Sequence, residues 1–323
     1  MFAHLDTTTS DLPPENSGAR LSGMPIRDSE TADPHRRYPR EDSNMSIAQS
    51  IETGVPDRTP KRHRYAVKLR CLDVARVEKL SRSMVRIVLT GPELEGFASL
   101  GFDDHVKIFF PLPGETEPNL PVIGPNGLEF PEGAPRPLAR DYTPRSFDAE
   151  KGELAIDFAT HHDGPASNWA KSARVGDKAW IAGPRGSFTI PFTFDWHLLI
   201  ADDTGLPALA RRLEEMPEGT RVVALIEVET EADRLDLATK ADASIIWVTQ
   251  KAAGGGDHDA LTEALRTLEL PEGDFFSWVA CESKAAKDLR AILIGEYGAN
   301  PKWTRASGYW RRGASGVHDH FDE

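Results

Sequence analysis

An octapeptide at residues 140–147, with the sequence RDYTPRSF, carries the residue types that hold a ring and a diphosphate. In an extended strand, residues two apart share a face, so Arg140 and Tyr142 can address the same ligand. A planar ring packs on an aromatic side chain, and a diphosphate is held by charged, forked donors. Thr143 adds a hydroxyl and a backbone N–H between them. We expect one strand over 140–148 that presents these groups together.

A second run, HHDGPASNWA at residues 161–170, reads as a turn that enters a short helix. Gly164 and Ala166 would let a ligand approach the backbone, and the helix N-terminus would present free N–H groups. Ser167 could cap the helix or bind a phosphate, and the sequence favours capping. Adjacent histidines in a strand face opposite ways and no third ligand has suitable spacing, so we expect no metal site.

Three further segments stand where a chain turns at the end of an apolar run: GPRGSF at 183–188, ADDTGLPA at 201–208 and WVACES at 278–283. Open α/β sheets bind ligands at the carboxyl ends of their strands, which favours the second and third segments as binding loops. Neither is a G-x-G-x-x-G, so neither establishes a dinucleotide site alone. GYWRRG at 308–313 adds aromatic and basic residues near the C-terminus.

Short apolar segments broken by Gly and Pro predict an antiparallel barrel in the first half of the chain. The Pro- and Gly-rich stretch 111–137 is expected to be a surface loop. After residue 194, apolar strands alternate with helical patterns, which predicts a mostly parallel, doubly wound sheet. The expected strands are 65–75, 84–90, 105–110, 140–148, 153–158, 178–182, 197–201, 221–228, 244–249, 275–280 and 304–309, and the expected helices 206–216, 259–268 and 284–294.

Residues 1–60 are polar and rich in Pro, Ser and Thr, and such a segment cannot offset its ordering entropy by burial. We expect them to be disordered, either as a regulatory tail or as an over-extended start, because Met24 and Met45 both precede the first strand. The basic cluster at 61–64 could bind a ligand, but a solvated entry into that strand is favoured. The polar tail at 314–323 is expected to fray.

Composition excludes several classes of function. The 323-residue chain has a formal net charge of −13, which argues against general binding to nucleic acid or anionic membranes. Two cysteines, Cys71 and Cys281, cannot build an iron–sulfur cluster or a four-cysteine zinc site. No apolar run could span a bilayer and no signal peptide is apparent, so we expect a cytoplasmic protein with reduced thiols.

In this order and spacing, the motifs resemble the siderophore-interacting proteins, flavin-dependent ferric-siderophore reductases related to the ferredoxin-reductase superfamily. The resemblance covers roughly residues 68–313 and includes R-x-Y-T-x-R, H-x-D-G-P-A-S-x-W-A, G-P-R-G-S-F, D-D-T-G-L-P-A and G-Y-W-R-R-G. It implies an FAD-binding β-barrel domain at 61–193 and an NAD(P)H-binding α/β domain at 194–313. It does not choose between NADH and NADPH.

The resemblance also implies roles for individual residues. Tyr142 would pack on the isoalloxazine and Thr143 would lie by the flavin N5, where hydride arrives, so these two are the expected catalytic residues. Arg140 and Arg145 would contact the flavin phosphate or hold the strand's geometry. The remaining expected cofactor contacts are His161, Gly164, Ala166 and Ser167 for the flavin, with Trp169 following them, and Asp203, Thr204, Gly205 and Glu282 in the second domain.

The implied reaction passes electrons from NAD(P)H through FAD to Fe(III) held by a siderophore, with Fe(II) released and no protein metal ligands required. Ferric catecholates are anionic, so a basic patch beside the flavin is expected within this acidic protein. Lys107, Arg185 and Arg311 are the candidates for it. We expect a monomer.

Three positions depart from the family's usual glycines: His162, Ala201 and Cys281. A side chain at either of the last two could crowd the nicotinamide pocket. We interpret Cys281 as a small packing residue, since nothing in its sequence neighbourhood lowers a thiol pKa. Two alternatives stay open: a general NAD(P)H-dependent flavin or electron-transfer reductase, and a flavin- or siderophore-binding protein without turnover.

Overall fold

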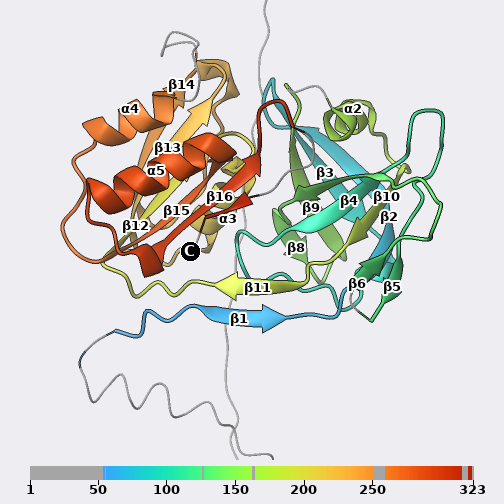
Figure 1. Cartoon of the computed structure of the whole chain (residues 1–323), viewed down its shortest axis with the longest axis horizontal. Helices are drawn as coiled ribbons and strands as arrows, with labels where there is room; N and C mark the ends of the chain where they lie inside the picture. Colours follow the sequence, from blue (N-terminus) through green and yellow to red (C-terminus); the bar gives the residue numbers. More distant parts are fainter. Residues whose placement is uncertain are drawn as a thin grey trace, which may run out of the picture. The chain divides into compact units, whose positions relative to one another are not determined.

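The computed structural model describes residues 54, 56–125, 127–161, 164–250, 259–314 and 319–321. Residues 53–323 form one compact unit, and its described part contains two lobes, one on each side of Figure 1. Most of the segment expected to be disordered, and His162, lie outside the described residues. Within the described ranges, no helix combines the length and the apolar composition needed to cross a bilayer.

The first lobe is an antiparallel sheet of seven strands in the order β7-β4-β10-β2-β3-β9-β8. Its alternating apolar residues fill one core, which includes Leu72, Ile87, Ile108, Ile156 and Ile181, each at most 1% exposed. The strands are β2 (Leu69–Lys79), β3 (Met84–Thr90), β4 (Val106–Phe110), β7 (Leu138–Tyr142), β8 (Ser146–Asp148), β9 (Glu153–Ala159) and β10 (Lys178–Ala182).

The octapeptide does not form the single strand expected over 140–148. Arg140 and Tyr142 belong to β7, at one edge of the sheet, whereas Ser146 begins β8, at the other edge. Pro144 lies between them and cannot donate to a strand ladder. Among the described strands no ladder joins β7 to β8, so the sheet curls without closing as a hydrogen-bonded barrel. The octapeptide therefore crosses the gap between the two edge strands, β7 and β8, which we call the open seam of the sheet.

Two short antiparallel pairs were not expected from the sequence. The Pro- and Gly-rich stretch contains a hairpin of β5 (Val122–Gly124) and β6 (Gly127–Glu129). The basic cluster is itself the strand β1 (Lys61–Arg64), which pairs along its full length with β11 (Gly186–Thr189). These two strands run side by side in Figure 1. The first strand of the main sheet accordingly starts later than predicted, at Leu69.

The second lobe has a six-stranded sheet in the order β14-β13-β12-β15-β16-β17. Its first five strands are parallel and β17 is antiparallel to β16. The chain order reverses between β12 and β15, which is where ligands bind in open parallel sheets. The strands are β12 (Trp196–Ala201), β13 (Arg221–Val228), β14 (Asp242–Thr249), β15 (Phe275–Glu282), β16 (Thr304–Trp310) and β17 (Asp319–His320).

Helices cover both faces of this sheet. The apolar side of α3 (Leu206–Glu215) packs on one face with Leu199, Ile226 and Trp278. On the other face, α4 (Asp259–Thr267) and α5 (Ser283–Gly295) pack over Leu198 and Val279 and lie in front of the sheet in Figure 1. The cluster under α3 also contains Met84 and Phe102 of the first lobe, so the two lobes share one apolar interface.

Candidate active site

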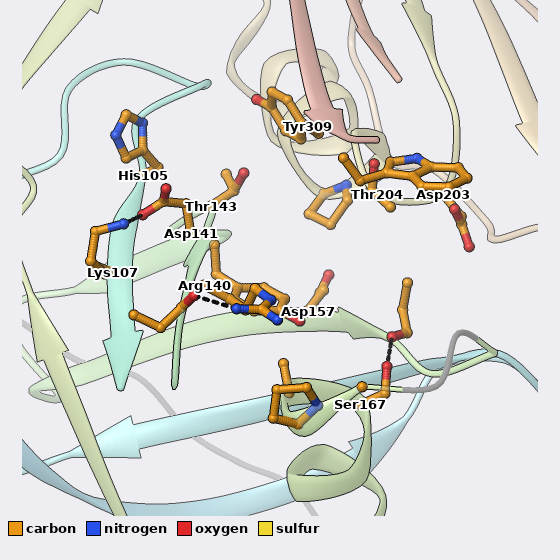
Figure 2. Close-up of a pocket in the computed structure, with 18 of the residues that line it drawn as sticks. His105, Lys107, Arg140, Asp141, Thr143, Asp157, Ser167, Asp203, Thr204 and Tyr309 are labelled. Carbon is orange, nitrogen blue, oxygen red and sulfur yellow. Dashed lines mark hydrogen bonds and ion pairs between the residues drawn. The ribbon is translucent and has the colours of Figure 1, made fainter. Parts of the chain in front are cut away.

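A cavity of about 290 Å³ lies where the open seam of the first sheet faces the carboxyl ends of β12 and β16. Figure 2 shows side chains from both lobes around it. The first lobe contributes β4, β7, β9 and the start of α2 (Pro165–Ser172), and the second lobe contributes the loop after β12 and the end of β16. Of the predicted site residues, it brings together Lys107, Arg140, Tyr142, Thr143, Gly164, Ala166, Ser167, Asp203 and Thr204.

Tyr142 and Thr143 occupy the seam itself. The Tyr142 ring leans on Phe158 of β9, with 4.3 Å between ring centroids and 37° between ring planes. Burial raises the pKa of Tyr142, so its phenol stays neutral. Thr143 is 6% exposed, and both Thr143 and Tyr309 of β16 line the cavity, from opposite lobes. Arg140 donates to the carbonyl of Ala139 at 2.7 Å and lies lower in the same cavity in Figure 2.

Two side chains of helix α3, in the second lobe, bind the octapeptide by hydrogen bonds and an ion pair. Arg211 donates to the Pro144 carbonyl at 2.9 Å, and to the hydroxyl and the carbonyl of Ser99 at 2.9 and 2.8 Å. Arg145, which is 6% exposed, forms a two-pronged ion pair with Glu214 of the same helix. Arg145 does not line the cavity, so its position supports the geometry of the strand rather than contact with a phosphate. Sequence reasoning missed Arg211 and Glu214, which read as the polar face of a helix.

The loop after β12 is organised by Asp202. Its Oδ1 accepts the Thr204 N–H at 2.9 Å, the Thr204 hydroxyl at 2.5 Å and the Gly205 N–H at 3.3 Å. Its Oδ2 accepts the indole N–H of Trp310 at 2.7 Å. One carboxylate thus joins the carboxyl ends of β12 and β16. The packing also requires Gly205, because a Cβ there would lie 2.4 Å from the carbonyl oxygen of Ala280.

His161 and Asp203 form an ion pair between the lobes, with 2.8 Å between His161 Nδ1 and Asp203 Oδ2. Burial raises the pKa of Asp203 well above its usual range, and the neighbouring charges of Asp202 and Glu227 raise it further. This contact joins the loop after β9 to the loop after β12 at the edge of the cavity.

The first turn of α2 presents backbone donors. Pro165 has no N–H, and the first helical hydrogen bond runs from Asn168 to Gly164, so the N–H groups of Ala166 and Ser167 precede that bond. No atom beyond its chain neighbours lies within 4 Å of a Cβ built on Gly164. The favoured interpretation of Ser167 as a cap is wrong: Pro165 starts the helix earlier, and the Ser167 hydroxyl donates to the Ala159 carbonyl at 3.0 Å.

Glu282, a predicted cofactor contact, does not line the cavity. Its Oε2 accepts the N–H groups of Lys284 and Ala285 at the start of α5, and its Oε1 accepts the Arg312 N–H at 3.2 Å. The two substitutions at usual glycine positions also point elsewhere: Ala201 packs under α3 and Cys281 under α5, each with 0% exposure. Neither crowds the cavity. Burial raises the pKa of the Cys281 thiol well above its ordinary value, which supports its interpretation as a packing residue.

The three basic candidates for a substrate site do not gather at one place. Lys107 lines the cavity and pairs with Asp141, with 2.7 Å between Nζ and Oδ1 (Figure 2). Arg185 lines a different cavity. Arg311 pairs with Asp319 at 2.6 Å and is half-exposed. In the GYWRRG segment it is Tyr309 and Trp310 that reach the cavity, although adjacent strand residues ordinarily face opposite ways, so nothing in the sequence signalled that both would do so.

Known families account for both lobes. Residues 73–188 match the family described as "Siderophore-interacting FAD-binding domain", and residues 194–313 match "Siderophore-interacting protein". An NADPH-dependent ferric-chelate reductase of Escherichia coli is 40% identical over 257 residues, which cover 78% of this chain and 97% of that protein. The chain belongs to the siderophore-interacting protein family.

Other members of the family extend the comparison. Ferric vibriobactin reductase ViuB of Vibrio cholerae is 31% identical over 76% of this chain and 90% of that protein. The crystal structure of a siderophore utilization protein from T. fusca matches with a TM-score of 0.75 and 38% identity, over 81% of this chain and 99% of that chain. A ferredoxin reductase of carbazole 1,9a-dioxygenase, at 17% identity and a TM-score of 0.51, shows that the fold is shared with ferredoxin reductases.

The cavity residues fit an FAD. The half-buried Tyr142 offers a neutral aromatic face for a planar ring, and the Thr143 hydroxyl offers a polar contact at the ring's edge. The backbone donors of Ala166 and Ser167 and the guanidinium of Arg140 are the kinds of group that can hold a diphosphate. The donor set therefore agrees with the FAD-binding family match.

Proposed function

We propose that this chain is an NADPH-dependent, FAD-containing ferric-siderophore reductase, which passes electrons from NADPH through FAD to Fe(III) in a siderophore. The single observation that carries the proposal is the cavity at the open seam of the first sheet, which faces the carboxyl ends of the parallel strands. A flavin site and a nicotinamide site would meet there. The relatives named as an NADPH-dependent ferric-chelate reductase and a ferric vibriobactin reductase support the substrate and coenzyme.

On the flavin side, in the proposed domain at 61–193, Tyr142 packs against the ring system. Thr143 and Tyr309, which line the cavity from opposite lobes, would hold the edge of the ring that the coenzyme must reach. Arg140 and the first turn of α2 hold the diphosphate. When bound, FAD supplies the conversion of a two-electron donor into single-electron steps. These residues would orient the ring within the cavity between the two lobes.

On the coenzyme side, in the proposed domain at 194–313, Asp203 and Thr204 contact the nicotinamide nucleotide at the end of β12. Asp202, Gly205 and Glu282 act indirectly, because they fix the loop and the start of α5. The His161–Asp203 pair closes one edge of the cleft and orients the loop after β9. With Ala201 and Cys281 turned into the two cores, the space before the flavin stays clear for a nicotinamide.

Fe(III) bound by a siderophore is the proposed substrate, and Fe(II) is the product, which siderophore oxygens hold more weakly. The two free thiols, Cys71 and Cys281, and the use of NADPH suit the reducing cytoplasm, where we place the reaction. One chain supplies both walls of the cavity, which supports a monomer as the active unit.

Anaerobic stopped-flow spectroscopy of the FAD-loaded protein tests the proposal. NADPH should bleach the flavin absorbance, and a ferric siderophore added next should restore it while a chelator traps Fe(II). Without bleaching by NADPH or NADH, the chain would be a binding protein rather than a reductase. Bleaching without reoxidation by any ferric siderophore would favour a general electron-transfer reductase.

A further inference from the structure

Asp157 of β9 adds a carboxylate to the wall of the cavity in the candidate active site. Only 4% of its surface is exposed, and Figure 2 shows it among the side chains of the first lobe. A buried carboxylate is costly unless opposite charges are paired with it. The partners of Asp157 therefore determine what charge the cavity receives from it.

Two guanidinium groups pair with Asp157. Arg86 lies directly opposite on β3 and donates to both carboxylate oxygens, from Nε at 2.7 Å and from Nη2 at 2.8 Å. Such a two-pronged pair fixes the orientation of the carboxylate as well as its charge. The hydrogen bonds to Asp157 raise the pKa of Arg86, so this guanidinium stays charged. Arg145 is the weaker partner, with 3.7 Å between its Nε and Oδ2 of Asp157.

Both cationic partners lie behind the carboxylate as seen from the cavity. Asp157 lines the cavity, whereas Arg86 and Arg145 do not. The ion pair of Lys107 with Asp141 differs in this respect, because both of its members line the cavity and their charges offset each other there. The Arg86–Asp157 pair instead presents its negative end to the cavity.

A fixed negative charge matters in a flavin site because the proposed reaction changes the charge of the site. Hydride transfer from NADPH brings in two electrons and one proton, which adds one negative charge. Two single-electron transfers to Fe(III) and the release of one proton remove that charge again. A carboxylate in the wall disfavours the charged, reduced state. Since little water screens buried groups, the effect extends over several ångströms.

We propose that the carboxylate of Asp157 lowers the reduction potential of the bound FAD and so makes the reduced flavin a stronger donor of electrons to ferric iron. The inference rests on the proposed reductase function. Arg86 acts through Asp157, because its charge weakens that of the carboxylate from behind. A siderophore holds Fe(III) more tightly than Fe(II), which makes the bound iron hard to reduce. A donor of low potential is therefore suited to this substrate.

Redox titration of the full-length, FAD-loaded protein tests the proposal without coenzyme or ferric complex. Anaerobic equilibration with a reference dye of known potential gives the midpoint potential of the flavin. D157N keeps the shape of the side chain and removes its charge. We expect it to shift the equilibrium about tenfold toward the reduced flavin, which is a rise of about 30 mV for a two-electron couple. One unit charge has about this effect on another about 12 Å away at an effective dielectric constant of about 20.

The Arg86 variants provide the opposite perturbation. R86Q removes the cation behind the carboxylate and should lower the midpoint potential, whereas R86K keeps the charge and should stay near the wild-type value. The matched control is E153Q on the same strand, β9. Glu153 pairs with Arg76 at 2.5 and 3.0 Å but does not line the cavity, so its replacement should shift the equilibrium less than twofold.

Opposite shifts from the two members of one ion pair distinguish an effect of charge from a loss of structure. Shifts of D157N and R86Q in the same direction would overturn the proposal, as would a midpoint potential in D157N no higher than in E153Q. If D157N retains too little FAD to titrate, the comparison of R86Q with R86K decides, and equal potentials would reject the role of charge. Failure of the reductase function appears separately, as wild-type protein whose FAD titrates normally but is not reduced by NADPH.

Discussion

Arg211 of α3 is expected to set both the stability of the two-lobed unit and its affinity for FAD. It is 8% exposed, and its guanidinium makes three hydrogen bonds to the first lobe, two to Ser99 and one to the carbonyl of Pro144. The Pro144 contact adjoins Thr143 in the seam of the sheet. Replacing Arg211 by Met keeps the length and apolar stem of the side chain and removes all three bonds, together with an ion pair to Glu215 on the same helix.

The size of the effect follows from these contacts. Hydrogen bonds from a charged donor are worth about 1.5–3 kcal/mol each, so three bonds at the lower limit amount to roughly 4–5 kcal/mol. Removing a buried cation recovers part of this, because the guanidinium no longer loses its hydration on folding. We expect Arg211→Met to lower the free energy of unfolding by about 3 kcal/mol, or roughly a hundredfold in the unfolding constant.

The assay is urea denaturation of the FAD-free protein, together with titration of FAD by quenching of its fluorescence. Arg211→Met should shift the urea midpoint downward and also weaken FAD binding, since the Pro144 carbonyl is released. Arg211→Lys should recover little, because an ammonium cannot span Ser99 and Pro144 as a fork does. Arg266→Met, which removes an exposed pair with Glu296, is the control and should change neither value. A stable Arg211→Met protein with normal FAD affinity would refute the positioning role of α3.

Three other expectations follow from single residues. Tyr142→Ala should lower the FAD-to-protein absorbance ratio after gel filtration. Tyr142→Phe keeps the ring packed on Phe158 and should leave that ratio unchanged. Unchanged flavin content in the alanine variant would exclude the stacking role. Burial raises the pKa of Glu227 from 4.5 to about 7, so folding favours its protonated form. Stability should therefore fall by roughly 3 kcal/mol as pH rises from about 4.5 to about 7, and Glu227→Gln should remove that part of the slope in urea titrations at each pH. Gly205→Ala places a Cβ against the Ala280 carbonyl, so the loop after β12 must move. We expect both the melting temperature and the affinity for NADPH to fall. A normal KM for NADPH would mean that the loop tolerates this movement.

The sequence alone was sufficient for most of the local structure. Strands that appear in the sequence as short apolar runs, such as Met84–Thr90, Lys178–Ala182 and Arg221–Val228, have the predicted bounds. Apolar periodicity is a local property, so it can be read without knowledge of distant partners. The hairpin inside 111–137 and the pairing of β1 with β11 could not be read in this way. They depend on contacts with residues far along the chain or on turns without alternation.

The candidate site likewise has some features that the sequence determines and others that only the fold determines. The types and order of the residues at 140–147, 161–170 and 201–208 determined that the chain carries groups for a ring, a diphosphate and a nucleotide, because those chemistries need particular side chains. The tertiary structure decided which of them meet. It placed Tyr142 and Thr143 at an open seam instead of within one strand, used Arg145 and Glu282 to hold the framework, and separated Arg185 from Lys107. Residue types fix what a side chain can bind, whereas its neighbours across the fold determine whether it is free to bind it.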